Sequence, residues 1–152
     1  MKRRRLNQVL VFVILCLAIF SFSSFVISNV KDKTYGSERF ASDMKSKNYK
    51  FELKDVQEDF LPTVRRRLII NNKNEAIDIY LYNNSNDMEA DSKRIDNGGC
   101  SYVNGNKSKK VSWSSIPHFY KKGNIIIQYI GINEKIISDL KDICGEQFAG
   151  FR

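Results

Sequence analysis

Histidine, tryptophan, proline and cysteine are scarce in this sequence of 152 residues. It contains one histidine, one tryptophan, two prolines and three cysteines. It also lacks the motifs Cys-x-x-Cys, His-Glu-x-x-His and Gly-x-Ser-x-Gly, as well as the glycine-rich loop that binds phosphate. Because zinc sites are built from clustered cysteine and histidine, these absences argue against a metal site, and no cofactor is expected.

The net charge of +8 is unevenly distributed along the chain. Four of the 25 basic residues lie within the first five positions, which leaves 21 basic residues against 17 acidic ones in the remainder. A protein that binds nucleic acid needs a concentrated basic face. We therefore expect no nucleic-acid partner.

The longest stretch without a charged residue covers positions 6–30. Its apolar span at 9–27 is about as long as a helix that crosses a hydrocarbon core of roughly 30 Å. Four cations precede this span, so the positive-inside rule predicts a cytoplasmic N-terminus and a C-terminal domain outside the cell. We predict a signal anchor or signal peptide at 1–30, a polar spacer at 31–36 and a single extracytoplasmic domain at 37–152.

The N-terminal segment has three alternative fates. An uncleaved signal anchor would hold the chain in the cell membrane as a single-pass protein, and this is the first prediction. Cleavage near Ser23, after a small-x-small pattern, would release the chain as a secreted protein. Lipidation at Cys16 is disfavoured because the preceding residue, Leu15, is large.

The remaining sequence predicts an α+β fold, with an antiparallel sheet covered by two or three helices. The reason is that runs of alternating apolar residues are separated by a few helical patterns, without a regular strand–helix–strand rhythm. The final helix is expected to begin near Asn133 and to end at Gly145. Helices are predicted at 37–47, 86–95 and 133–144, and strands at 49–53, 64–70, 76–82, 101–103, 111–113 and 125–130.

Two cysteines, Cys100 and Cys144, lie beyond the apolar segment. In an oxidising compartment they predict a disulfide that ties the last helix to the sheet. The alternative is a pair of buried free thiols, which pack like small hydrophobic side chains.

The single histidine, His118, supplies the second hypothesis for function. If it lay beside a free Cys100 or Cys144, it could activate that thiol for nucleophilic catalysis, as in a thiol-dependent or hydrolytic enzyme. Nothing in the spacing of these residues requires such a pair, and a lone histidine among aromatic residues is more often structural.

Lysines gather around the turns in the second half of the chain, close to the only tryptophan. They predict contact with an anionic envelope polymer or with lipid headgroups. Ordinary lysine-rich turns over core aromatics are the alternative. The residues of this predicted contact are Lys107, Lys109, Lys110, Lys121, Lys122 and Trp113.

One cation of the Arg65-Arg66-Arg67 run is expected to point away from its two neighbours, because side chains alternate along a strand. If Arg66 were buried it would need a carboxylate, and Asp78 on the next predicted strand is the candidate partner.

The segments Phe40-Ala41-Ser42-Asp43-Met44 and Pro117-His118-Phe119-Tyr120 resemble parts of uncharacterised small membrane-anchored or lipoprotein-like extracytoplasmic proteins of Gram-positive bacteria. This resemblance covers most of the chain after position 30. It implies a bacterial extracytoplasmic setting, but it implies no particular activity.

These observations predict a non-catalytic interaction domain at the outer face of the membrane. Its partner would be an envelope component or a membrane protein. The alternative function is the thiol-dependent or hydrolytic enzyme described above.

Overall fold

The computed structural model describes residues 35–70 and 75–151, which belong to one compact unit. The predicted signal anchor or signal peptide, with its apolar span at 9–27, lies outside these residues, as does most of the predicted spacer. In the described part of the chain, none of the helices is both long enough and apolar enough to cross a membrane.

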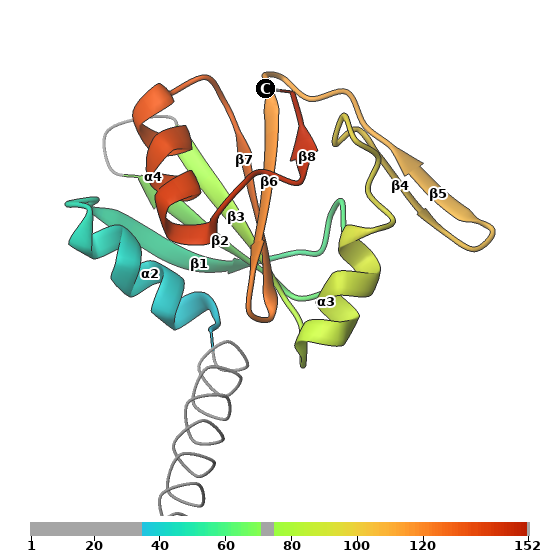
Figure 1. Ribbon diagram of the computed structural model, residues 1–152, viewed down its shortest axis with the longest axis horizontal. Helices are drawn as coiled ribbons and strands as arrows, with labels where there is room; N and C mark the ends of the chain where they lie inside the picture. The colour runs from blue at the N-terminus through green and yellow to red at the C-terminus, as the bar shows by residue number, and fades with distance from the viewer. Residues whose placement is uncertain (1–34, 71–74, 152) are drawn as a thin grey trace, which may run out of the picture. The chain divides into compact units, whose positions relative to one another are not determined.

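A six-stranded antiparallel sheet forms the centre of the fold, which confirms the predicted α+β class (Figure 1). In residues 35–70 and 75–151, three helices accompany this sheet, and a separate two-stranded hairpin extends beside it. In spatial order the strands are β1 (Phe51–Val56), β2 (Arg65–Ile70), β3 (Glu75–Leu81), β7 (Ile125–Ile130), β6 (Pro117–Lys122) and β8 (Ala149–Gly150).

Helices α2 (Ser37–Ser46) and α4 (Glu134–Cys144) cover one face of the sheet (Figure 1). We call the cluster that they bury the helix-side core. It consists of Tyr35, Phe40, Met44, Leu68, Ile70, Ile77, Ile79, Tyr120, Ile125, Ile127, Tyr129, Ile136, Leu140 and Ile143.

Helix α3 (Ser85–Ser92) and the hairpin of β4 (Ser101–Asn104) and β5 (Lys107–Lys110) lie on the opposite face (Figure 1). The cluster beneath them is the hairpin-side core. Its members are Phe60, Leu61, Tyr80, Tyr82, Met88, Ile95, Tyr102, Phe119, Ile126 and Ala149.

Helix α4 shows how the local sequence determines an element. The side chain of Asn133 accepts hydrogen bonds from the backbone N–H groups of Lys135 and Ile136, which would otherwise be unpaired at the helix start. The helix stops at Gly145, whose φ of 89° is accessible to glycine at little cost. Both predicted ends are therefore confirmed.

Strand β6 was not predicted, and the strand predicted at 111–113 is wrong. Strand β6 begins with Pro117 and ends with two lysines, so its sequence lacks the apolar alternation that identifies a half-buried strand. Proline is tolerated there because it is the first residue of the strand. The turn at Asn104-Gly105 leads instead into the polar strand β5.

A buried carboxylate joins strands β2 and β3. Asp78 accepts hydrogen bonds from Arg67 at 2.7 and 2.8 Å and from Arg65 at 3.1 Å. The predicted pairing of Arg66 with Asp78 is therefore wrong. Arg66 points to the other face, where it pairs with Glu38 and Asp55. The alternation was anticipated correctly, but the buried member of the run is Arg65.

We predict that Asp78→Ala lowers the free energy of unfolding by about 3 kcal/mol, because it leaves Arg65 buried with only the exposed Asp59 as an anionic partner. Asp55→Ala is the matched control, since its carboxylate is 85% exposed and should contribute less than about 1 kcal/mol. Urea unfolding followed by Trp113 fluorescence measures both. Equal losses in the free energy of unfolding would contradict the role of Asp78 as the partner of the buried Arg65.

Candidate functional site

The predicted disulfide between Cys100 and Cys144 is not formed, and both thiols are free. Cys144 packs against the helix-side core. Cys100 follows Gly99, which lies against the ring of Phe119 in the hairpin-side core. The cysteines thus belong to opposite faces of the sheet, whereas a disulfide needs Cβ atoms about 4 Å apart.

His118 lies at the start of β6 and is only 5% exposed. Its Nδ1 is 2.8 Å from Gln147 Oε1, and its Nε2 is 3.1 Å from the carbonyl oxygen of Gly131. The ring also stacks on Tyr129. Both ring nitrogens are therefore occupied by partners other than a thiol, and the structure does not bring His118 and a cysteine together as a catalytic pair.

The electrostatic surroundings of Cys144 oppose a nucleophilic role. The pKa of this thiol is raised to about 12, chiefly by burial. The ammonium group of Lys122 lowers the pKa by a smaller amount, and the nearby Asp43 carboxylate acts in the same direction as burial. Because the thiolate is the reactive form, Cys144 is protonated and unreactive at neutral pH.

The five lysines and Trp113 do not form the single contact surface that the sequence predicts. The three lysines of β5 lie together on an exposed strand, in which every residue is exposed. Lys121 and Lys122 are neighbours in β6, so their side chains go to opposite faces of the sheet.

Lys121 and Lys122 are both used within the fold. The Lys121 ammonium group lies 2.5 Å from a Glu89 carboxylate oxygen, and the cation is also 5.4 Å from the centre of the Phe148 ring. Lys122 donates to the carbonyl oxygen of Ile143 at 2.6 Å and lies over the ring of Tyr35. Burying their stems against aromatic rings makes both lysines part of the packing.

Trp113 holds the base of the hairpin. Its indole N–H donates to the carbonyl oxygen of Gly99 at 2.8 Å. Its half-buried ring meets Phe60 edge to face, with 5.4 Å between the ring centres. This side chain therefore stabilises the hairpin-side core and presents little surface to a ligand.

The β4–β5 hairpin is attached firmly through β4. Tyr102 is buried, and its hydroxyl donates to Asp91 at 2.9 Å. The backbone N–H of Val103 donates to the carbonyl oxygen of Arg94, which extends the pairing at the inner edge of β4. On β5, the Lys109 ammonium group reaches the carbonyl oxygen of Asp59. The result is a rigid base that carries an outer strand rich in lysine.

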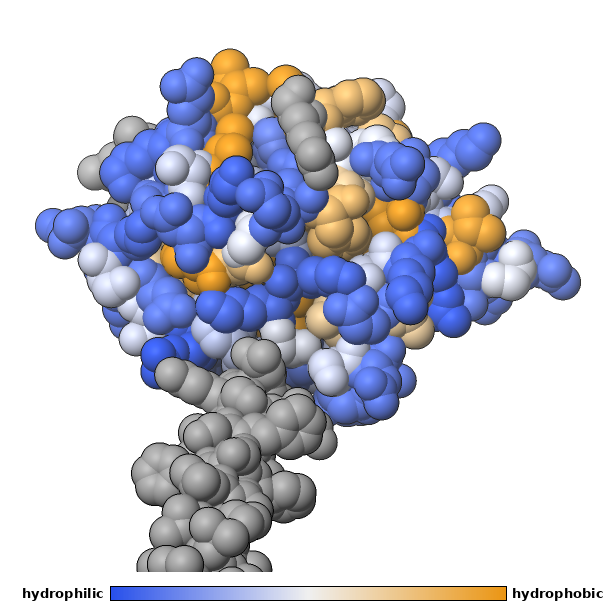
Figure 2. All heavy atoms as spheres, in the orientation of Figure 1, coloured by the Kyte–Doolittle hydropathy of each residue, from blue (hydrophilic) through white to orange (hydrophobic). Residues whose placement is uncertain are grey.

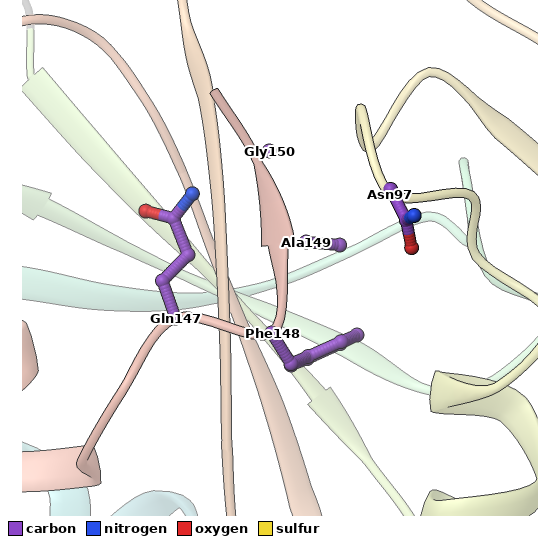
Figure 3. Close-up of a pocket in the computed structure, with 5 residues that line it drawn as sticks. All are labelled: Asn97, Gln147, Phe148, Ala149 and Gly150. Atoms are coloured by element: carbon purple, nitrogen blue, oxygen red, sulfur yellow. The ribbon is translucent and has the colours of Figure 1, made fainter. Parts of the chain in front are cut away.

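A hollow of about 380 Å³ lies beside the short edge strand β8 (Figure 3). It is lined by Asn97, Gln147, Phe148, Ala149 and Gly150. These residues offer amide and apolar groups but no titratable or nucleophilic side chain, and Gln147 already contacts His118. None of its five lining residues could therefore act as a nucleophile or as a general acid or base.

Among residues 35–70 and 75–151, no group of three or more histidine, cysteine, aspartate or glutamate side chains could hold a metal ion. Comparison of the chain with protein-family models, with curated proteins and with solved structures found no match.

We predict that Cys100 is alkylated faster than Cys144 in the native protein. At pH 8 a pKa of about 12 leaves roughly 1 in 10⁴ of the Cys144 thiols ionised, and the rate should rise about tenfold per pH unit. Peptide mapping after timed iodoacetamide treatment measures both sites, and the same treatment in urea is the control. A Cys100–Cys144 linked peptide, or equal native rates, would contradict this arrangement.

Proposed function

We propose that the chain is a non-catalytic binding domain at the outer face of the cell membrane, where the β4–β5 hairpin contacts an anionic envelope polymer. The observation that carries this proposal is the strand β5, with Lys107, Ser108, Lys109 and Lys110 all exposed on a firmly attached hairpin. The placement outside the membrane rests on the charge and apolar pattern of the N-terminal 30 residues.

The geometry of the hairpin favours a flexible polymer over a flat lipid surface. Lys107 and Lys109 point to one face of the two-stranded ribbon, because they are two residues apart, and Lys110 points to the other. A flat surface can meet only one of these faces at a time. A chain of phosphate groups can pass around the ribbon and meet both, with a gain of about 1 kcal/mol for each lysine near the anionic partner.

The face drawn in Figure 2 shows no broad apolar patch that would compete with the hairpin as a contact surface. On the face drawn in Figure 2, hydrophobic atoms occur in small groups between hydrophilic ones. Exposed apolar residues of this dispersed kind are ordinary on soluble domains. Electrostatic attraction at the hairpin is therefore the stronger basis for binding.

We predict that the triple variant K107E, K109E and K110E binds a soluble poly(glycerol phosphate) at least about 100-fold more weakly than the unchanged chain, since three favourable contacts become repulsive. The control reverses three exposed lysines elsewhere, Lys45, Lys50 and Lys141, and so has the same net charge. Titration calorimetry at low and high salt measures both.

The two variants separate a local contact from a general charge effect. If the control loses as much affinity as the hairpin variant, the hairpin is not the binding site. Binding of the unchanged chain to anionic lipid vesicles, with none to the polymer, would contradict the polymer proposal in favour of a membrane surface.

A further inference from the structure

Strand β1 is the outer strand of the six-stranded sheet, and β2 pairs with only one of its edges (Figure 1). An open edge presents unpaired backbone N–H and C=O groups, which can pair with another strand. The backbone pattern and the side chains of β1 determine which strand would fit this edge.

The hydrogen bonds of the sheet define which groups of β1 face outward. Leu81 donates its N–H to the carbonyl oxygen of Val64, so Val64 and every second residue after it direct their backbone groups toward β3. The intervening residues of β2 direct theirs toward β1, where they meet Glu52, Lys54 and Val56. The outward groups of β1 are therefore those of Phe51, Leu53 and Asp55.

The side chains of β1 are divided between its two faces. Phe51 and Leu53 pack against the helix-side core, and the ammonium group of Lys45 lies 5.8 Å from the centre of the Phe51 ring. Glu52 and Lys54 point to the opposite face, with 61% and 50% of their side chains exposed. They pair with each other at 3.0 Å across the surface of their own strand.

This charge pattern is complementary to itself. If two copies of β1 run antiparallel about a two-fold axis at Leu53, Glu52 of each copy lies opposite Lys54 of the other. The outward groups of Leu53 then form the central hydrogen-bonded pair, and those of Phe51 bond with those of Asp55. Glu52 and Lys54 fall in a non-hydrogen-bonded position, where opposing Cα atoms are only about 4.5 Å apart.

We infer that β1 is the dimerisation edge of this protein and that its partner is β1 of a second copy. Charged residues often protect an edge strand from pairing. An edge that carried charges of one sign would repel a second copy of itself. The opposite charges of Glu52 and Lys54 instead face each other across the two-fold axis, at two contacts in each dimer. The two sheets would become one continuous sheet, and this inference does not depend on the proposed polymer binding.

Reversing the charges on β1 one at a time tests this pairing. E52K places two basic side chains opposite each other at both contacts of the dimer, and K54E places two acidic side chains there. Each single variant should dimerise at least about tenfold more weakly than the unchanged full-length chain, because like charges directly opposite are destabilising. The double variant, E52K with K54E, restores opposite charges and should dimerise like the unchanged chain.

Mixing the two single variants supplies the decisive measurement. In their heterodimer a basic side chain of the E52K chain lies opposite an acidic side chain of the K54E chain at both contacts. The heterodimer should therefore form even though neither variant pairs with itself. Sedimentation of the full-length chains in density-matched detergent measures dimerisation. Co-purification of the two variants through two different tags detects the heterodimer.

Two results would overturn the inference. One is an unchanged chain that stays monomeric at hundreds of micromolar. The other is equal dimerisation of all variants, since association would then use another segment of the chain.

Discussion

The burial of strand β7 on both faces is the constraint on which the rest of the structure depends. Ile125, Ile127 and Tyr129 enter the helix-side core, and Ile126 between them enters the hairpin-side core. All four are fully buried. The same strand pairs with β3 on one side and with β6 on the other. The two clusters therefore share one backbone, and neither covering layer can be removed without exposing apolar surface of this central strand.

This arrangement explains why charge gathers at the periphery. The strands next to β7 use their side chains for packing or for buried pairs, as Asp78 does with the two arginines of β2. Among the described residues, the outer strand β1 and the hairpin strand β5 each pair with one neighbouring strand of their sheet, and both carry exposed charges. Mixed charge on β1 suits self-pairing, and the lysines of β5 suit an anionic partner. The two proposed interactions thus use separate surfaces.

The fold could be predicted from the sequence where a single local pattern determined the structure. The periodic apolar residues and the Asn133 cap defined α4, and the apolar run of β7 identified a buried strand. Strand β6 could not be found in this way, because its lysine stems pack on aromatic rings that are distant in sequence. The predicted lysine surface is divided because β5 and β6 are separate elements and because Lys121 and Lys122, as neighbours in β6, point to opposite faces of the sheet. The disulfide was wrongly predicted because the separation of Cys100 and Cys144 depends on which face of the sheet each element covers.

Native-state hydrogen exchange of the backbone amides tests the central role of β7 most directly. We expect the hydrogen-bonded amides of β7, β3 and β6 to exchange most slowly and with one common free energy, since they open only when the whole domain unfolds. The amides of β5 and those at the outer edge of β1 should exchange faster. If β7 exchanged before α4 or the hairpin, the two layers would be stable without their shared strand, which would contradict its central role.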